Sequence, residues 1–257
     1  MWNSYIVTPL TNLLLWIYDI LGHNVNAFGF AIILFTILIR AVTWPLNTQQ
    51  LKSAQAMQEL QQDKDWLAIQ KKYKDNREKL AQEQMRVYKE KGISPFGSCL
   101  PLLIQFPIII GLYQSIIRAL ASTPLALLQL TRSIYPFLNI ATIIPLNSRF
   151  LWMDLGRPEY IKMFGFNLPT LAIIVALTTY IQSKLTTPAA ANPKDQSAAM
   201  GKMMTLYMPF LLGYFALTFA SGLSVYFITS NLLGIMQYAM MGKANWRNLL
   251  PGAKKSQ

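Results

Sequence analysis

Five apolar stretches, separated by more polar segments, dominate the pattern of this chain. A helix of about twenty apolar residues crosses a hydrocarbon layer roughly 30 Å thick. We therefore predict an all-α, polytopic membrane protein with five transmembrane helices. The predicted spans cover residues 24–46, 98–119, 167–184, 203–220 and 221–241.

The first 23 residues are also largely apolar, but they include Pro9, Asn12 and Asp19. Their leucines and isoleucines recur at helical spacing. This pattern predicts an amphipathic helix over residues 1–23 that lies on the membrane surface. A poorly apolar membrane span is the alternative.

Residues 47–97 differ in kind, because they hold ten Lys or Arg and seven Asp or Glu. Apolar side chains at helical spacing predict a polar helical hairpin outside the membrane, with arms near 47–73 and 76–91. Asp75 and Glu78 fit a capping box that starts the second arm. The hairpin is either a recruitment surface for other macromolecules or a solvated helical pair held by its charges.

Three further segments connect or follow the spans. Residues 120–166 are mostly apolar and are predicted to form a partly embedded extracytoplasmic segment with short helices. Residues 185–202 are expected to be a cytoplasmic linker, and residues 242–257 a basic cytoplasmic tail.

Composition and charge support this organisation and give it an orientation. Only 13% of residues are charged and 53% are hydrophobic, whereas soluble domains carry about 25% charged residues. Of the 23 Lys and Arg, 17 lie in the hairpin, in the linker together with Lys184 just before it, and in the tail. Cytoplasmic loops carry the Lys and Arg excess, which places the N-terminus outside and the C-terminus inside. The basic tail is expected to meet anionic lipids, or alternatively ribosomal RNA.

The residues that would support catalysis are scarce. The chain has one cysteine, Cys99, and one histidine, His23, so neither an internal disulfide nor a clustered zinc site is expected. An intramembrane protease would need histidine, serine or carboxylates inside its spans, and the predicted spans hold no Asp or Glu. We expect no enzymatic activity, no metal and no cofactor.

Arg40 is the outstanding residue, because it lies inside the first predicted span. A cation there costs about 2.5–3.5 kcal/mol on insertion scales, and the spans offer it no acidic partner. Either the side chain extends to the cytoplasmic interface, or a water-filled cavity solvates it. A cavity is favoured by other polar residues in the spans, namely Gln105, Gln114, Thr178, Thr179, Gln182, Ser230, Asn231 and Gln237.

Several motifs around these residues resemble the YidC/Oxa/Alb insertase family, over roughly residues 24–241. They are residues 39–40 (Ile-Arg), 44–46 (Trp-Pro-Leu), 91–95 (Lys-Gly-Ile-Ser-Pro), 99–107 (Cys-Leu-Pro-Leu-Leu-Ile-Gln-Phe-Pro), 111–113 (Gly-Leu-Tyr), 221–227 (Ser-Gly-Leu-Ser-Val-Tyr-Phe) and 230–231 (Ser-Asn). The chain resembles a short member, without room for the large periplasmic domain of Gram-negative relatives.

The resemblance implies a membrane protein insertase with a hydrophilic groove open to the cytoplasm, acting alone or beside the Sec translocon. Its expected partners are nascent membrane proteins, the translocon, the ribosome and targeting factors. It implies the bacterial cytoplasmic membrane, with an organelle membrane as the alternative. The groove is expected to be lined by Arg40, Thr36, Gln105, Gln182, Tyr226 and Phe227.

A small-solute or ion transporter that uses Arg40 as an anion site is the competing function. Transporters often carry two repeated halves, and five spans without a detectable repeat do not fit that pattern.

Overall fold

The computed structural model describes residues 1–73, 76–92, 100–120, 123–144, 146–163, 165–186 and 203–241. Within these ranges the chain is mostly helical, which confirms the fold expected from the sequence in its coarse form. The helices are α1 (Thr8–Ile20, after a π-helical turn at Asn3–Val7), α2 (Ala27–Val42), α3 (Trp44–Gln62), α4 (Lys64–Lys72), α5 (Arg77–Glu90), α6 (Leu100–Leu120), α7 (Pro124–Ser133), α8 (Ile140–Ile143), α9 (Thr170–Thr186), α11 (Met208–Thr218, after a π-helical turn at Met203–Tyr207) and α12 (Ser221–Met240).

Two short antiparallel hairpins interrupt the segment that was expected to hold only short helices. They consist of β1 (Arg149–Phe150) with β2 (Met153–Asp154), and β3 (Ile161–Met163) with β4 (Phe166–Leu168). Tight hairpin turns use left-handed backbone, and Leu151 and Gly165 take it, with φ of 53° and 83°. Turn chemistry therefore produces strands that apolar periodicity did not indicate.

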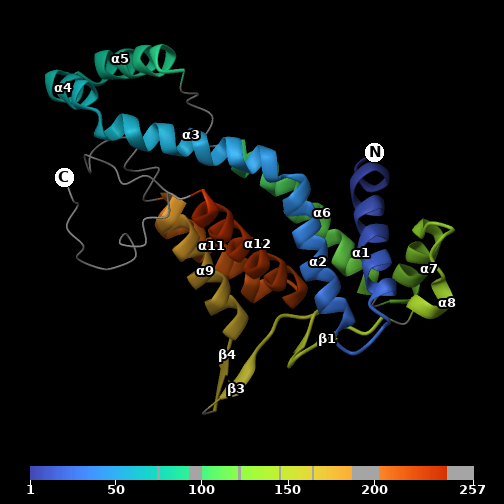
Figure 1. Cartoon of the computed structure of the whole chain (residues 1–257). Coiled ribbons are helices and arrows are strands. Elements are labelled where there is room, and N and C mark those ends of the chain that lie inside the picture. Colours follow the sequence, from blue (N-terminus) through green and yellow to red (C-terminus); the bar gives the residue numbers. More distant parts are fainter. Residues whose placement is uncertain are drawn as a thin grey trace.

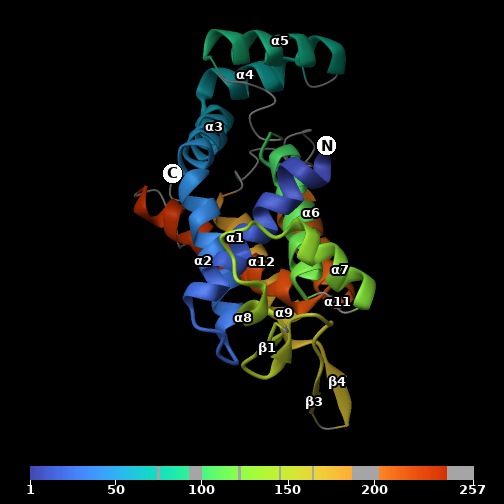
Figure 2. The ribbon, with the colours of Figure 1, turned by 90° about the vertical axis from the view of Figure 1, so that its right-hand side faces the viewer.

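Six helices pack into a central bundle (Figures 1 and 2). Helix α9 packs against α11 and α12, α2 against α1 and α12, and α1 against α6. Their shared core is apolar, and its fully buried side chains include Leu14, Phe28, Ile32, Phe35 and Leu112. Burying one such side chain contributes about 1.5–3 kcal/mol. Together these side chains hold the helices in fixed positions relative to one another.

The N-terminal helix α1 is part of this bundle. Thr11, Asn12 and Leu15 are buried in it, and Trp2 donates a hydrogen bond from Nε1 to Gln114 Oε1 of α6 at 2.9 Å. Asn12 donates from Nδ2 to the Ser133 carbonyl at 2.9 Å. Asn12, one of the polar residues that suggested a surface helix, thus binds a neighbouring element, and the interfacial placement of residues 1–23 stays a prediction.

A sharp bend separates the first predicted span from the polar arm. Helix α2 ends at Val42, and α3 starts at Trp44 with Pro45 in its first turn, 62° away in direction. Proline lacks a backbone N–H and its ring clashes with the carbonyl four residues earlier, so the helix breaks there. Arg40 therefore lies in the last turn of α2.

Helices α4 and α5 lie side by side at the end of α3, away from the bundle, while β3 and β4 lie at the opposite end (Figures 1 and 2). Leu60, Trp66, Val87 and Tyr88 form their small buried core. The first arm is broken at Asp63, whose carboxylate accepts from the Asp65 N–H at 2.9 Å and caps α4.

The cap of the second arm also differs from the one expected. Asn76 caps α5 by accepting from the Lys79 N–H at 3.0 Å, whereas the expected Asp75 lies outside the described residues. A side-chain amide oxygen serves as an N-cap as well as a carboxylate does, so the sequence pattern allowed both positions.

Asp63 also holds the two arms together, because its carboxylate accepts a hydrogen bond from Lys91 Nζ. That bond, with the Asp65 N–H, lowers the pKa of Asp63 below its ordinary 3.8. A lowered carboxyl pKa stabilises the fold above the unfolded-state pKa, and the stabilisation is lost as pH falls through the folded pKa. We expect Lys91→Met to raise the Asp63 pKa toward 3.8, measured by NMR titration of ¹³C-labelled aspartates.

Lys89→Met, two residues earlier near the end of α5 and exposed, is the matched control and should leave that titration unchanged. An Asp63 pKa that stays low in Lys91→Met would contradict the assigned cause. The effect on unfolding should be small, because exposed ion pairs contribute little.

The length and hydropathy of single helices do not establish the five spans. Among the described residues, no helix is by itself both long and apolar enough to cross a bilayer. Two bent pairs reach that size, Ala27–Val42 with Trp44–Ser53 and Pro107–Leu120 with Pro124–Ser133, and Thr170–Thr186 and Thr205–Thr218 are shorter apolar helices. The count of five spans stays a prediction.

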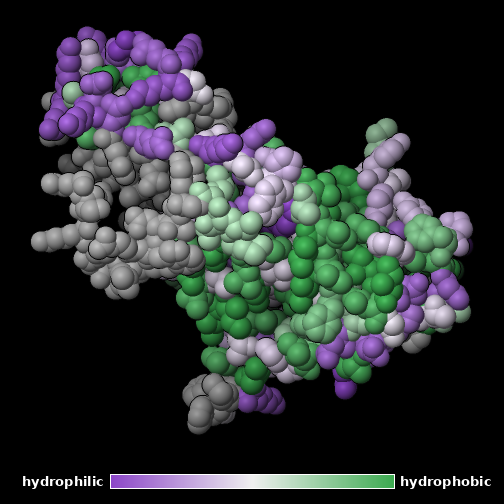
Figure 3. Space-filling view, in the orientation of Figure 1, coloured by the Kyte–Doolittle hydropathy of each residue, from purple (hydrophilic) through white to green (hydrophobic). Residues whose placement is uncertain are grey.

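The surface nevertheless divides into two regions (Figure 3). Hydrophilic side chains cover α4 and α5, while the bundle presents a mostly hydrophobic face. Large apolar side chains are exposed on the bundle helices, among them Phe30, Leu34, Leu177, Phe210, Tyr214 and Leu232. Contiguous exposed apolar surface of this kind marks contact with lipid or protein.

Candidate functional site

Arg40 is bound to Ser230, which lies in the middle of α12. Its Nε donates to Ser230 Oγ at 3.0 Å, and its Nη2 donates to the same Oγ at 2.6 Å and to the Ser230 carbonyl at 2.9 Å. The sequence suggested either extension to the interface or solvation by water. The structure shows a third arrangement. A serine hydroxyl and a peptide carbonyl accept some of the guanidinium's hydrogen bonds, without a negative charge beside it.

The guanidinium keeps capacity for a further ligand. Arg40 is half-buried, and none of its hydrogen bonds within the described part of the chain uses Nη1. Nη1 is not among the fully buried atoms without a partner. A planar guanidinium held on one edge presents its remaining N–H groups in a fixed direction, which suits carbonyl and carboxylate acceptors.

Gln182 of α9 meets Arg40 at a glycine of α12. A Cβ built at Gly234 would lie 2.4 Å from Gln182 Nε2 and 3.8 Å from Arg40 Nη2. The ends of these two polar side chains therefore both lie next to the open side of Gly234. The structure thus brings together two of the site residues named from the sequence.

The aromatic residues lie on the same helix but are packed inside. Tyr226 precedes Ser230 by one turn, is 3% exposed, and interacts electrostatically with Arg40. Its ring centroid lies 5.7 Å from that of Phe227, which is equally buried. Both side chains therefore belong to the buried core of the bundle rather than to an open surface.

Two predicted groove residues remain, Thr36 and Gln105. Thr36 is fully buried, and its hydroxyl donates to the Ile32 carbonyl of its own helix at 2.6 Å. The backbone of Gln105 belongs to α6, but its side chain lies outside the described part of the structure. Their role in a groove stays a prediction.

Residues that the sequence named only as polar fix the orientation of α12. Asn231 Nδ2 donates to Thr178 Oγ1 at 3.1 Å and to Thr179 Oγ1 at 2.8 Å. Gln237 Nε2 donates to Thr48 Oγ1 of α3 at 3.1 Å. These bonds set the rotation of α12, so that Ser230 faces Arg40.

The segment between α6 and α9 anchors the other end of the bundle. Glu159 is buried and accepts hydrogen bonds from Trp152 Nε1 at 3.1 Å, Thr170 Oγ1 at 2.7 Å and the Leu171 N–H at 3.1 Å. A carboxylate also favours the N-terminal end of the α9 dipole.

Helix α12 is held by the same segment. The Ser221 N–H donates to the Arg157 carbonyl at 2.9 Å, and the Gly222 N–H donates to the Leu155 carbonyl at 3.0 Å. Two backbone donors that a helix start leaves unsatisfied are therefore bound by this segment.

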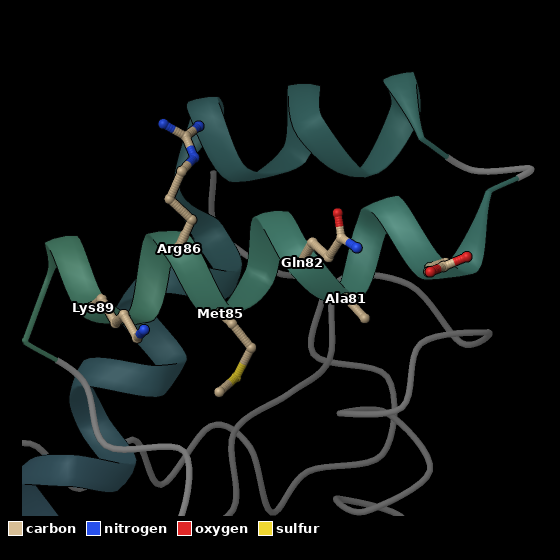
Figure 4. A pocket seen from close by; sticks show the side chains of 6 residues that line it. Ala81, Gln82, Met85, Arg86 and Lys89 are labelled. Atoms are coloured by element: carbon tan, nitrogen blue, oxygen red, sulfur yellow. The ribbon is translucent and has the colours of Figure 1, made fainter.

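A hollow lies along α5, where Met85 and Ala81 point away from α4 (Figure 4). It is lined by Glu78, Ala81, Gln82, Met85, Arg86 and Lys89. Arg86 is paired with Glu83 at 2.7 Å and Glu90 at 3.1 Å, and the hydrogen bond that it donates to Glu83 raises the pKa of Arg86. This open surface of mixed charge around an exposed methionine is suited to contact with another macromolecule rather than to chemistry.

The fold and the site together define a helical bundle with an apolar exterior, an internal guanidinium available for binding, and a charged helical arm. The family described as "60Kd inner membrane protein" matches residues 20–247. The chain belongs to this family, as the sequence motifs predicted.

Its relatives carry a consistent name. "Membrane protein insertase YidC" of Oceanobacillus iheyensis is 33% identical over 248 residues, covering 94% of this chain and 84% of the relative. "Membrane protein insertase MisCA" of Bacillus subtilis is 34% identical over 240 residues, covering 92% of this chain and 77% of the relative.

A solved structure is similar as well. It is described as "Active YidC insertase crystal structure with the first transmembrane domain resolved", with a TM-score of 0.57 and 28% identity. The match covers 94% of this chain and 46% of that one, so this chain spans about half the length of the crystallised protein.

Proposed function

We propose that this protein inserts nascent membrane proteins into the bacterial cytoplasmic membrane and helps them fold, receiving their polar segments at Arg40. Family membership supports the insertase function, and relatives named insertases favour it over solute transport. The observation that carries the site is the guanidinium held by Ser230 beside Gln182, with Nη1 left for a ligand. The function is binding, without bond chemistry.

The physical task of the site is to lower the cost of moving polar groups through hydrocarbon. An unpaired peptide group or carboxylate loses several kcal/mol when it leaves water for an apolar medium. A hydrated groove open to the cytoplasm shortens that path, and Arg40 offers a charged donor within it. Tyr226 and Phe227 are buried in the bundle on the same helix as Ser230, so their proposed part is to support that helix rather than to meet the substrate.

The orientation and partners belong to the same proposal. The N-terminus lies outside and the C-terminus inside, which puts the arm α3–α5 in the cytoplasm. There the open hollow on α5 is available to the ribosome, to targeting factors or to the Sec translocon. The basic tail, which lies outside the described residues, contacts anionic lipids.

Replacing Arg40 by alanine tests the proposed function directly. A hydrogen bond to a charged group is worth about 1.5 kcal/mol or more, so insertion of a substrate with an acidic translocated tail should fall about tenfold. A neutral tail should lose less. The measurement is protease protection of the tail in proteoliposomes that contain the purified protein.

Arg132→Ala is the matched control, because Arg132 is an exposed cation on α7, and it should insert both tails normally. Equal insertion of every substrate by Arg40→Ala and the unchanged protein would remove Arg40 from the mechanism.

A further inference from the structure

We infer that Gly234 determines the substrate range of the insertion site, because its missing side chain seats the Gln182 amide beside the Arg40 guanidinium. This inference rests on the proposed function and extends it to neutral polar segments. A guanidinium can only donate hydrogen bonds, whereas a carboxamide both donates and accepts them. Together they match a peptide group, which carries one donor and one acceptor.

The geometry leaves no room for a side chain at this position. A Cβ at Gly234 would lie 2.4 Å from Gln182 Nε2 and 3.2 Å from Gln182 Cδ. Contacts of real Cβ atoms below 3.0 Å essentially never occur. Because the overlapping atoms are the far end of a flexible side chain, an alanine would expel the amide and leave the helix in place.

Other glycines in the described helices meet different neighbours. At Gly213 of α11 a Cβ would lie 3.3 Å from Ala176 Cβ and 3.6 Å from the Ala172 carbonyl oxygen, a tight contact with α9 that involves no polar side chain. Glycine inside a helix costs about 1 kcal/mol relative to alanine. At Gly234 this cost is accompanied by a polar side chain in the vacated space, which points to recognition rather than to packing alone.

Gln182 has the position to work with Arg40 on one ligand. Arg40 Nη2 lies 3.8 Å from the same virtual Cβ, and Nη1 is free to donate within the described part of the chain. A peptide carbonyl can therefore accept from Nη1 while its neighbouring N–H donates to the Gln182 amide oxygen. Acidic tails depend on Arg40 alone, and neutral polar tails depend on both groups.

The test compares two substrates that differ only in whether the translocated tail is acidic or is neutral and rich in Asn and Ser. Gly234→Ala should lower insertion of the neutral tail about fivefold, as expected from the loss of one neutral hydrogen bond, and change the acidic tail by less than about twofold. Gln182→Ala should give the same pattern, and the double variant should be no worse than either. Gly213→Ala is the control and should insert both tails normally.

A second measurement is independent of insertion. In detergent micelles, NMR should show a nuclear Overhauser effect between the Gln182 side-chain amide and the Gly234 α-protons. A second effect is expected between the Gln182 side-chain amide and the Arg40 guanidinium protons in the unchanged protein, and it should disappear in Gly234→Ala.

Equal losses for both tails, a normal neutral tail, or additive losses in the double variant would overturn the inference. So would a Gln182–Arg40 contact that persists in Gly234→Ala. If Arg40→Ala inserts every substrate normally while these NMR contacts behave as expected, the proposed function fails and the seating of Gln182 stands.

Discussion

Replacing Glu159 by alanine should lower the free energy of unfolding by about 3 kcal/mol, because it removes a buried carboxylate that accepts three hydrogen bonds. The donors left without a partner would be the Trp152 indole, the Thr170 hydroxyl and the Leu171 N–H. For a chain of this size the melting temperature should fall by roughly 6–12 °C. Thermal unfolding in detergent, followed by circular dichroism, measures the change.

Two variants sharpen this prediction. Glu159→Gln keeps one acceptor and should recover part of the loss. Asp154→Asn changes an exposed acid of the same segment and should stay within about 0.5 kcal/mol of the unchanged protein. A Glu159→Ala protein that melts at the original temperature would show that α9 does not need this cap.

Gly29→Ala should be the second most damaging change, lowering the free energy of unfolding by about 2 kcal/mol. A Cβ at Gly29 of α2 would lie 2.0 Å from Phe150 Cδ2 and 2.1 Å from Phe150 Cγ. Overpacking of this kind costs about 1–3 kcal/mol and sometimes more, while alanine regains only about 1 kcal/mol of helix propensity. The same melting experiment measures it.

Phe150→Ala provides the matched background. With the ring removed, Gly29→Ala should become neutral or stabilising, so the two substitutions should not be additive. A melting temperature that rises in Gly29→Ala alone would mean that the Phe150 ring moves aside at little cost. Strand β1 would then be packed only weakly against α2.

The apolar stretches, and the polar segments that separate them, predicted the mostly helical fold. The polar hairpin could be located because composition changes within a few positions. The first span was predicted to end at residue 46, whereas α2 ends at Val42, because Pro45 breaks the helix. The split at Asp63 and the strands near Leu151 and Gly165 could not, because they depend on single side-chain caps and left-handed turn residues.

The site was predictable in its charge but not in its partners. Arg40 and Gln182 were found because polar groups inside apolar spans are costly and because motifs resembled a known family. The Ser230 bond joins residues 190 positions apart in the sequence, which no periodicity encodes. Gly234 gave no signal at all, since a missing side chain becomes informative only when its neighbours in space are known.

The bend after Thr43 has a mechanical consequence. Helix α12 is hydrogen-bonded to the chain on both sides of this bend. Ser230 binds Arg40 before it, and Gln237 binds Thr48 after it. The charged arm, α3–α5, extends from one side of the bend, and Arg40 lies close to the bend on the other side. A macromolecule that tilts the arm would therefore strain both hydrogen bonds at once. Binding to the arm would in this way be coupled to the position of the Arg40 side chain.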